Sequence, residues 1–274
     1  FGGGNDKIII NTAGENKFDM GTGWDEVTIN TDYSESGKNL TLENVEIVDT
    51  DNTSNFKMNE GDVINFGSAN YTKLYLKNEN VLQGGNVTFD ADSNYQYIHF
   101  KDTITFNSNE QIATTFQQGF DRIYFNSNGA NKVNITDMKA ELGVKDNLYW
   151  YSGSGDDKWI IENGGEGITS YYSNMGGGTD KMLIRGSWNG GYKARSVEKL
   201  YISDKQSMST DETNLSYFGT SQIIMKSGST MTYSYWAWNG ENVQQYTKTF
   251  SSSQTVDGKT FTFVNDVDSS FGDF

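Results

Sequence analysis

The chain has 274 residues, with 21 Lys and Arg against 36 Asp and Glu, which gives a formal net charge of −15. A surface this acidic repels phosphate backbones and anionic headgroups, so we expect neither a nucleic-acid partner nor binding to an anionic membrane. Cysteine is absent, which excludes disulfides, zinc thiolates and a thiol nucleophile. The 30 glycines and the 14% of aromatic residues favour strands and tight turns over helices.

No apolar run approaches the roughly 20 residues that a membrane-spanning helix needs, so we do not expect the chain to span a membrane. The N-terminal segment has no basic stretch followed by an apolar stretch, the pattern of a signal peptide. Because the sequence begins at Phe1 rather than Met, we expect a fragment or a processed chain.

Several short segments predict strands in chain order. Alternating or aliphatic patterns, bounded by Asn, Gly and Ser, indicate strands at 72–76, 94–100, 121–125 and 222–225. Only 135–144 has a helical pattern, with Thr136 or Asp137 as the N-cap. Residues 266–274 mix acids with aromatics in the manner of a type I secretion signal, with a final strand as the alternative. Short strands without intervening helices predict an all-β fold.

The segment from Gly2 to Ile29 recurs in divergent form from Gly153 to Ile184. Further on, 45–49 aligns with 200–204 and 66–68 aligns with 218–220. We therefore predict two divergent internal copies, residues 1–150 and 151–274. No linker-like segment separates them, so we expect one continuous body.

Both copies contain paired Gly-x-Gly-x-Asp-x-apolar units, four in all. Their glycines and aspartates are Gly2, Gly4 and Asp6; Gly21, Gly23 and Asp25; Gly153, Gly155 and Asp157; and Gly176, Gly178 and Asp180. Glycine permits positive φ, so such a loop can turn its carbonyl oxygens inward, and the Asp adds a hard anionic oxygen. Calcium takes about six to eight oxygen ligands, so these loops are candidate Ca²⁺ sites. The alternative is a Gly-rich turn closed by an Asx hydrogen bond, with no metal.

The four units resemble the nonapeptide repeat of RTX proteins, Gly-Gly-x-Gly-x-Asp-x-apolar-x. They lack its first Gly, which is replaced by Phe1, Met20, Ser152 and Met175. The resemblance implies a calcium-binding parallel β-roll with a turn of about 18 residues. It also implies type I secretion and folding on external calcium, and hence an extracellular place on a bacterial cell surface.

The spacing of the units agrees with stacked turns. Asp6 and Asp25 are 19 residues apart (25 − 6), and Asp157 and Asp180 are 23 apart (180 − 157). The resemblance also implies a loop on the opposite edge, midway between the units. In the first copy that loop is 11–19, where Asn16 replaces the Asp, and in the second copy 161–174 has lost the pattern. We therefore predict at most one good calcium between the paired loops of each copy.

The aromatic and titratable residues suggest further roles. Trp159 and Met182 follow the unit aspartates at the inward position, so we expect them in the core. His99 is the only histidine, and we expect a structural strand residue. A Ser-His-Asp triad could use only this histidine and no Gly-x-Ser-x-Gly turn is present, while a His-Glu-x-x-His metal site is impossible, so we do not expect an enzyme. The alternative is a glycosidase or lyase, which would need only carboxylates.

Three tryptophans are candidate ligand contacts. Trp236 and Trp238 alternate with Tyr233 and Tyr235, so each pair shares one face of a strand. Exposed rings could stack on sugars, whereas buried ones would be core or interface anchors. Trp24 lies beside Asp25 in a loop and is expected to be an exposed contact residue.

These observations predict an all-β fold, a parallel β-roll or β-solenoid with irregular β insertions. The first functional hypothesis is a non-catalytic, calcium-binding extracellular structural protein, an S-layer or surface-assembly subunit that self-associates into a lattice or fibre. The alternative is a calcium-stabilised carbohydrate-binding or adhesion module of a secreted RTX adhesin or polysaccharide-active protein. A lattice subunit should self-associate, whereas a module should stay monomeric and hold a cell-surface polysaccharide on its aromatic side chains.

Overall fold

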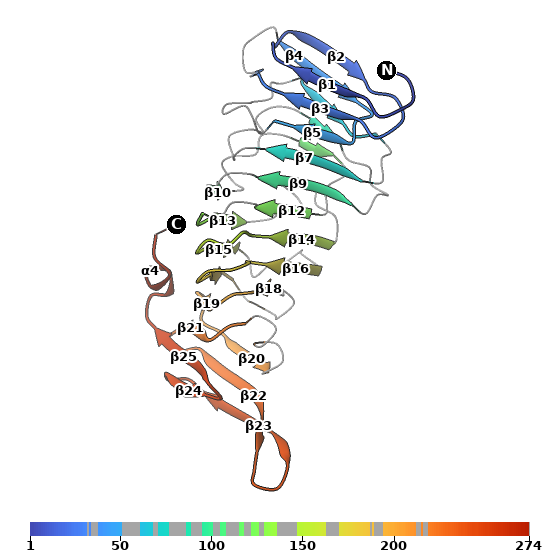
Figure 1. The fold of residues 1–274 in the computed structure, drawn as a ribbon. Helices are drawn as coiled ribbons and strands as arrows, with labels where there is room; N and C mark the ends of the chain where they lie inside the picture. The colour runs from blue at the N-terminus through green and yellow to red at the C-terminus, as the bar shows by residue number, and fades with distance from the viewer. Residues whose placement is uncertain are drawn as a thin grey trace.

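The computed structural model shows a β-solenoid, in which strands of successive turns stack in parallel along an elongated body (Figure 1). It describes residues 1–31, 33, 38–50, 61–67, 71–76, 86–88, 95–100, 105–107, 115–117, 122–125, 129–135, 147–162, 170–186, 188, 194–211, 215 and 219–273. The N terminus lies at one end, and the hairpin of β22 (Thr230–Trp238) and β23 (Val243–Phe250) projects from the other. The predicted fold class is confirmed.

Two sheets run along most of the body. The nine-stranded sheet contains, in spatial order, β1 (Lys7–Ile10), β3 (Glu26–Ile29), β5 (Ile47–Asp49), β7 (Thr72–Leu76), β9 (Gln96–Phe100), β12 (Arg122–Phe125), β14 (Asn147–Tyr151), β16 (Ser170–Asn174) and β18 (Ala194–Arg195). The eight-stranded sheet contains β10 (Thr105–Asn107), β13 (Lys132–Ile135), β15 (Lys158–Ile161), β17 (Lys181–Ile184), β19 (Lys199–Ile202), β21 (Gln222–Lys226), β25 (Lys259–Val264) and β24 (Gln254–Val256).

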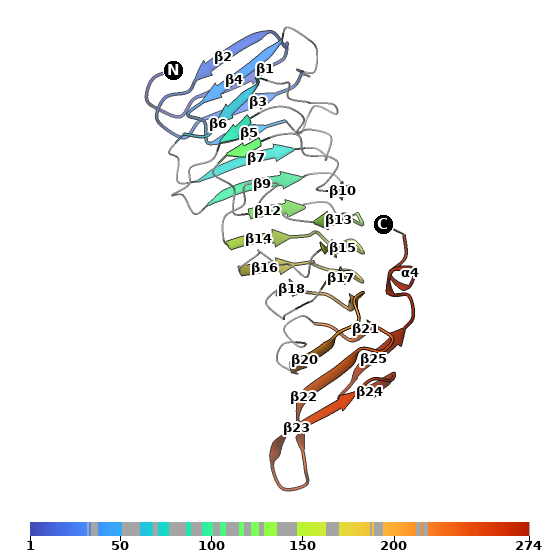
Figure 2. The ribbon, with the colours of Figure 1, turned by 180° about the vertical axis from the view of Figure 1, so that it is seen from behind.

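Two shorter sheets lie toward the two ends of the solenoid (Figure 2). The five-stranded sheet contains β11 (Thr115–Gln117), β8 (Asn86–Thr88), β6 (Val63–Asn65), β4 (Asn39–Glu43) and β2 (Glu15–Asp19). The three-stranded sheet contains β20 (Ser207–Asp211), β22 and β23. Pairing is parallel except in the hairpins β22–β23 and β24–β25. The chain thus alternates first between the nine- and five-stranded sheets, and later between the nine- and eight-stranded ones.

The core consists of columns of apolar side chains, because in-register parallel pairing places equivalent residues of successive turns on top of one another. One column contains Val27, Val48, Leu74 and Ile98. Another contains Trp159, Met182, Leu200, Ile223 and Phe261. The expectation that Trp159 and Met182 are core residues is confirmed. Alternation along the strand determines which residues enter the core: Thr72, Leu74 and Leu76 of β7 are buried, whereas Lys73 and Tyr75, which alternate with them, are only partly buried.

The eight-stranded sheet is buried on its outer face as well. Outward-pointing residues Ile160, Leu183 and Tyr201 are covered by the C-terminal helix α4 (Val267–Phe271), through Val267 and Phe271. Burial on both faces explains why these strands read as continuous apolar runs rather than as alternating ones. The alternative of a final strand at 266–274 is wrong, because Asp266 accepts the Ser269 N–H and caps a helix there.

The strands predicted at 72–76, 94–100, 121–125 and 222–225 correspond to β7, β9, β12 and β21. Most of the helix predicted at 135–144 lies outside the described residues, and Ile135 itself ends β13. The boundary predicted near residue 150 falls within β14, and the nine-stranded sheet includes strands from both sides of it. Among the described residues, no helix is long and apolar enough to cross a membrane.

Candidate functional site

The Gly-x-Gly-x-Asp units form turns that immediately precede strands, and the two units of each copy are stacked on one another. In the first copy, Gly4 N–H donates to Thr22 O over 2.9 Å and Thr22 N–H donates to Gly2 O over 3.1 Å. In the second copy, Gly177 N–H donates to Gly153 O over 3.2 Å. The first pair leads into β1 and β3 and the second into β15 and β17, so the two pairs lie against different sheets.

Glycine is required in these turns because the stacked backbones approach closely. A Cβ built on Gly23 would lie 1.9 Å from Gly4 O, and one built on Gly178 would lie 2.4 Å from Gly155 O. Both residues also have strongly positive φ, 151° and 134°. Gly177, between two constrained glycines, has ordinary φ, and its Cβ would meet only Ser154 Cβ at 3.9 Å.

Three of the unit aspartates, Asp25, Asp157 and Asp180, accept a backbone N–H from the preceding turn. Asp25 Oδ1 accepts the Asp6 N–H over 2.8 Å, and Glu46 Oε2 accepts the Asp25 N–H over 2.6 Å. The same kind of bond recurs at the second pair of units, over 2.6 to 2.8 Å. There the backbone N–H of Asn131 donates to Asp157, that of Asp157 to Asp180, and that of Asp180 to Glu198. We call these two series of bonds the carboxylate ladder. It fixes the register of successive turns.

The sequence reasoning missed the last members of the ladder, Glu46 and Glu198. A signal for them was present in the sequence: Glu46 follows Val45 and Glu198 follows Val197, and the two Val-Glu pairs are 152 residues apart. Both valines are buried. The predicted alignment of 45–49 with 200–204 is therefore wrong by three residues. A glutamate replaces the aspartate at the end of each series, and its longer side chain still reaches the backbone of the previous turn.

The ladder leaves one oxygen of several buried carboxylates without a partner. Asp25, Asp157 and Asp180 are fully buried, and the Oδ2 of each accepts no hydrogen bond from the described residues. Burial raises the pKa of Asp157 to about 6 and that of Asp180 to about 8; the negative charges of Asp157 and Glu198 add to the latter shift. At neutral pH a proton or a cation would therefore stabilise Asp180, and a cation would stabilise Asp157.

The donor chemistry of the turns fits calcium, although carboxylates are few. Each stacked pair contains a buried carboxylate oxygen without a hydrogen bond, and calcium prefers hard oxygen ligands such as carboxylates and backbone carbonyls. Within the part of the chain that the structure describes, no group of three or more His, Cys, Asp or Glu side chains could hold a metal ion. Carbonyl oxygens and water would therefore have to supply most of the ligands.

The loop predicted on the opposite edge at 11–19 is wrong in its second half, because β2 begins at Glu15. Asn16 Oδ1 accepts the Gly14 N–H and the Tyr33 hydroxyl, which gives this residue a structural role. In the second copy, the described part of 161–174 is the end of β15, Glu162 and the strand β16.

Asx turns, the metal-free alternative, do occur, but the unit aspartates do not make them. Asp19 Oδ1 accepts the Gly21 N–H, and Asn174 Oδ1 accepts the Gly176 N–H, over 3.1 and 3.0 Å. The hydrogen bonds from Asn44 and from Gly21 lower the pKa of Asp19. Asp19 is exposed and Asn174 is partly buried, and each closes the start of its turn. In contrast, Asp25, Asp157 and Asp180 are fully buried.

The candidate ligand contacts near the C terminus lie on the projecting hairpin. Trp236 and Trp238 are 53% and 65% exposed on one face of β22, whereas Tyr233 on the other face is fully buried. The predicted alternation is confirmed. Val243 pairs with Trp238 across the hairpin and is also exposed, so the tip presents an apolar surface.

Trp24 and His99 lie on or beside the nine-stranded sheet. Trp24 is exposed in its turn, as predicted, and its ring lies 5.4 Å from that of Tyr71. His99 lies on β9, stacked between Tyr75 at 4.7 Å and Tyr124 at 4.8 Å. Its ring is part of an aromatic stack on the sheet.

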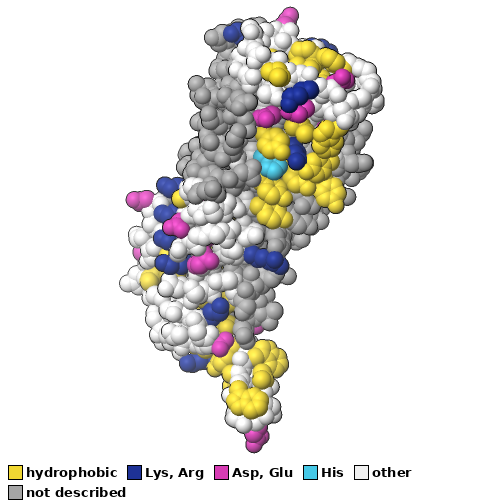
Figure 3. Space-filling view, viewed as in Figure 1, with side chains coloured by type: hydrophobic (Ala, Val, Ile, Leu, Met, Phe, Trp, Pro, Cys, Tyr) yellow, Lys and Arg dark blue, Asp and Glu magenta, His cyan; other side chains and the backbone are white. Residues whose placement is uncertain are grey.

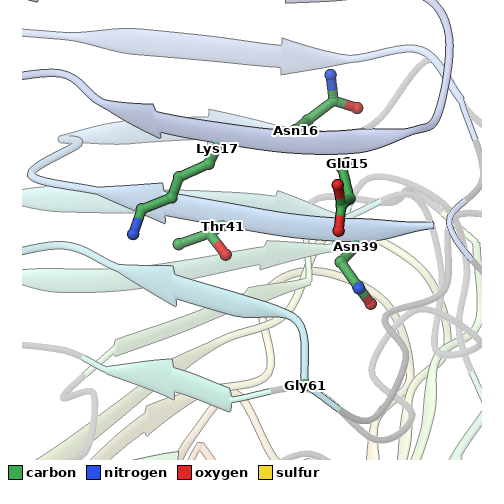
Figure 4. Close-up of a pocket in the computed structure, with 6 residues that line it drawn as sticks. All are labelled: Glu15, Asn16, Lys17, Asn39, Thr41 and Gly61. Atoms are coloured by element: carbon green, nitrogen blue, oxygen red, sulfur yellow. The ribbon is translucent and has the colours of Figure 1, made fainter. Parts of the chain in front are cut away.

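An open pocket of about 540 Å³ lies over the five-stranded sheet, where β2 and β4 pair (Figure 4). Glu15, Asn39 and Gly61 lie at one end, and Lys17 and Thr41 at the other. Among the described residues of this lining, Glu15 is the acidic group.

No protein-family model, no curated protein and no solved structure matches this chain. The likeness to RTX repeats therefore depends on the four Gly-x-Gly-x-Asp units alone.

Proposed function

We propose that this protein is a non-catalytic, calcium-stabilised structural solenoid of the extracellular surface, a subunit of an S-layer or similar assembly. Calcium would bind between the paired Gly-x-Gly-x-Asp turns and hold successive turns together. Type I secretion in an unfolded state, followed by folding on external calcium, accords with the RTX-like units and with the acidic composition.

The observation that carries this proposal is the unsatisfied oxygen of each buried unit aspartate. A buried charge without a partner is costly, so its environment should provide a counter-charge. In the ladder, like charges also follow each other from turn to turn, as Asp157, Asp180 and Glu198 do. A divalent cation between the turns would satisfy the free oxygens and offset this repulsion.

Asp180→Asn should remove most of the calcium response of the second copy. The amide oxygen can still accept the Asp157 N–H, but the charge that attracts the cation is lost. In calcium-free buffer at pH 8 the variant should be more stable than the wild type. Saturating calcium should stabilise the wild type by about 2.7 kcal/mol more than the variant, measured by chemical denaturation, if the free ion is at 100 times the site's Kd.

Asp156→Asn is the matched control. Asp156 is the neighbouring carboxylate and also accepts a backbone N–H from the next turn, that of Thr179 over 2.7 Å, but it is exposed. Its variant should retain the full calcium response. Equal calcium responses of the wild type and Asp180→Asn would contradict a calcium site at the stacked turns.

The hairpin tip supports the self-association part of the proposal. Exposed Trp236, Trp238 and Val243 belong to the hairpin of β22 and β23, which projects beyond the body (Figure 1), so another copy could bury them. Trp236→Ala/Trp238→Ala should shift the mass of the calcium-loaded protein from assemblies toward one chain, measured by light scattering after size exclusion. A wild type that stays monomeric at high concentration would instead favour the binding-module hypothesis.

A further inference from the structure

Aromatic side chains cover the outer face of the nine-stranded sheet over several turns. They come from the turn before β3 and from β7, β9, β12 and β14 with their preceding residues. We call them the aromatic face: Trp24, Tyr71, Tyr75, Tyr95, Tyr97, His99, Tyr124 and Tyr151. Figure 3 shows them as one continuous patch around the histidine.

Strand register produces a column of stacked rings on this face. Tyr75, His99, Tyr124 and Tyr151 are paired in register along β7, β9, β12 and β14. Their successive centroids are 4.6 to 4.8 Å apart, and their planes lie within 20° of one another. Because these rings cover each other's faces, the column is a rigid support. Its four side chains are partly exposed, and the Nε2 atom of His99 is buried.

The rings beside the column are tilted instead. The Tyr71 ring makes angles of 32° with Trp24, 35° with Tyr95 and 48° with Tyr97. Tilted rings cover each other only in part, and Trp24 and Tyr95 are 41% and 49% exposed. This part of the face therefore keeps flat apolar surface in contact with water.

We propose that the aromatic face binds an extended, neutral polysaccharide. A sugar ring has an apolar C–H face and an equatorial belt of hydroxyls. The C–H face of the sugar matches the flat surface of Trp24 and Tyr95, and its hydroxyls match the tyrosine hydroxyls of the adjacent column.

The net charge of the chain and the spacing of its turns limit which polysaccharides could bind. A chain with a net charge of −15 disfavours a polyanion. Lys73 lies within the face, but its Nζ is held over the rings of Tyr71 and Tyr75, at 5.0 and 5.9 Å from their centroids. Turns recur about every 4.8 Å along the sheet, close to the sugar repeat of an extended β-1,4-linked chain, so such a chain could lie along the axis.

Native gels containing hydroxyethyl cellulose, glucomannan or polygalacturonate test the proposal, with calcium in every gel. We expect a neutral polysaccharide to retard the wild type. Trp24→Ala/Tyr95→Ala should weaken that binding about tenfold, as expected for the loss of two stacking rings. Trp236→Ala/Trp238→Ala, on the distant hairpin, should bind as the wild type does. Tyr95→Thr, which retains a strand-compatible residue, replaces the double variant if that variant does not fold by circular dichroism.

The proposal is overturned if neither neutral polysaccharide retards the wild type, or if only polygalacturonate does. It is also overturned if the folded Trp24 and Tyr95 variants bind as the wild type does, or if they lose self-association and not polysaccharide binding, because the face would then be a contact between copies. The inference does not rest on calcium binding, so the calcium response of Asp180→Asn can fail while this result stands.

Discussion

Gly178→Ala is expected to be among the most destabilising single substitutions in the chain. The new Cβ would lie 2.4 Å from Gly155 O, and the residue would have to keep a φ of 134°. Backbone atoms of the neighbouring turn cannot yield as a flexible side chain can, so the two turns would have to separate and lengthen the ladder bond between Asp157 and Asp180. We expect a loss of about 4 kcal/mol in the free energy of unfolding, measured by chemical denaturation.

Gly177→Ala is the control for this prediction. It makes the same chemical change one residue earlier, but its Cβ would meet only Ser154 Cβ at 3.9 Å and its φ is not strained. We expect a change of less than about 0.5 kcal/mol. Similar losses for the two variants would show that the close stacking of the turns is not what requires glycine.

In calcium-free buffer, the protein should become less stable as the pH rises from about 4 to about 8. In the folded chain the pKa of Asp157 is about 6 and that of Asp180 about 8, because both are buried, whereas an unfolded Asp has a pKa of about 3.9. Over this window the folded chain binds more protons than the unfolded chain, so the free energy of unfolding falls with pH. The two pKa values lie about 2 and about 4 above that of an unfolded Asp, and each pKa unit corresponds to about 1.4 kcal/mol, so we expect a loss of up to about 8 kcal/mol, measured by urea denaturation at several pH values.

Calcium binding and the Asp180→Asn substitution should each reduce the change of the free energy of unfolding with pH, because neither state requires a proton on Asp180. Calcium does so by supplying positive charge at pH 8, and the variant does so by removing the titrating group. A calcium-free wild type with a flat or rising stability between pH 4 and 8 would show that these carboxylates are ionised in the folded state without a counter-charge.

Local patterns in the sequence were sufficient for the solenoid and for several strands. Repeated glycine–aspartate turns predicted stacking, and alternation predicted β7 and the two faces of β22. The inward positions of Trp159 and Met182 followed from the same repeat. These features depend on residues close together in the chain, which a sequence pattern can display.

The features that were missed depend on pairing between distant strands. Along the ladder the turn length varies from 18 residues, between Asp180 and Glu198, to 26, between Asn131 and Asp157. The predicted alignment of 45–49 with 200–204, at an offset of 155 residues, paired Glu46 with Tyr201 instead of Glu198, which lies at the offset of 152 residues that the second aligned segment has. The aromatic column could not be predicted from the sequence either, because Tyr75 and Tyr151 belong to one stack only through the register of the strands between them.

The central claim is that calcium occupies the stacked Gly-x-Gly-x-Asp turns. Equilibrium dialysis of calcium against the purified chain at pH 7.5 tests it most directly, with Asp25→Asn/Asp180→Asn alongside. We predict saturable binding of one ion per pair of stacked turns in the wild type, and loss of that binding in the double variant, which should remain folded because its amide oxygens can keep the ladder bonds. A wild type that binds no calcium at millimolar concentration, or a double variant that binds as much as the wild type, would contradict the claim.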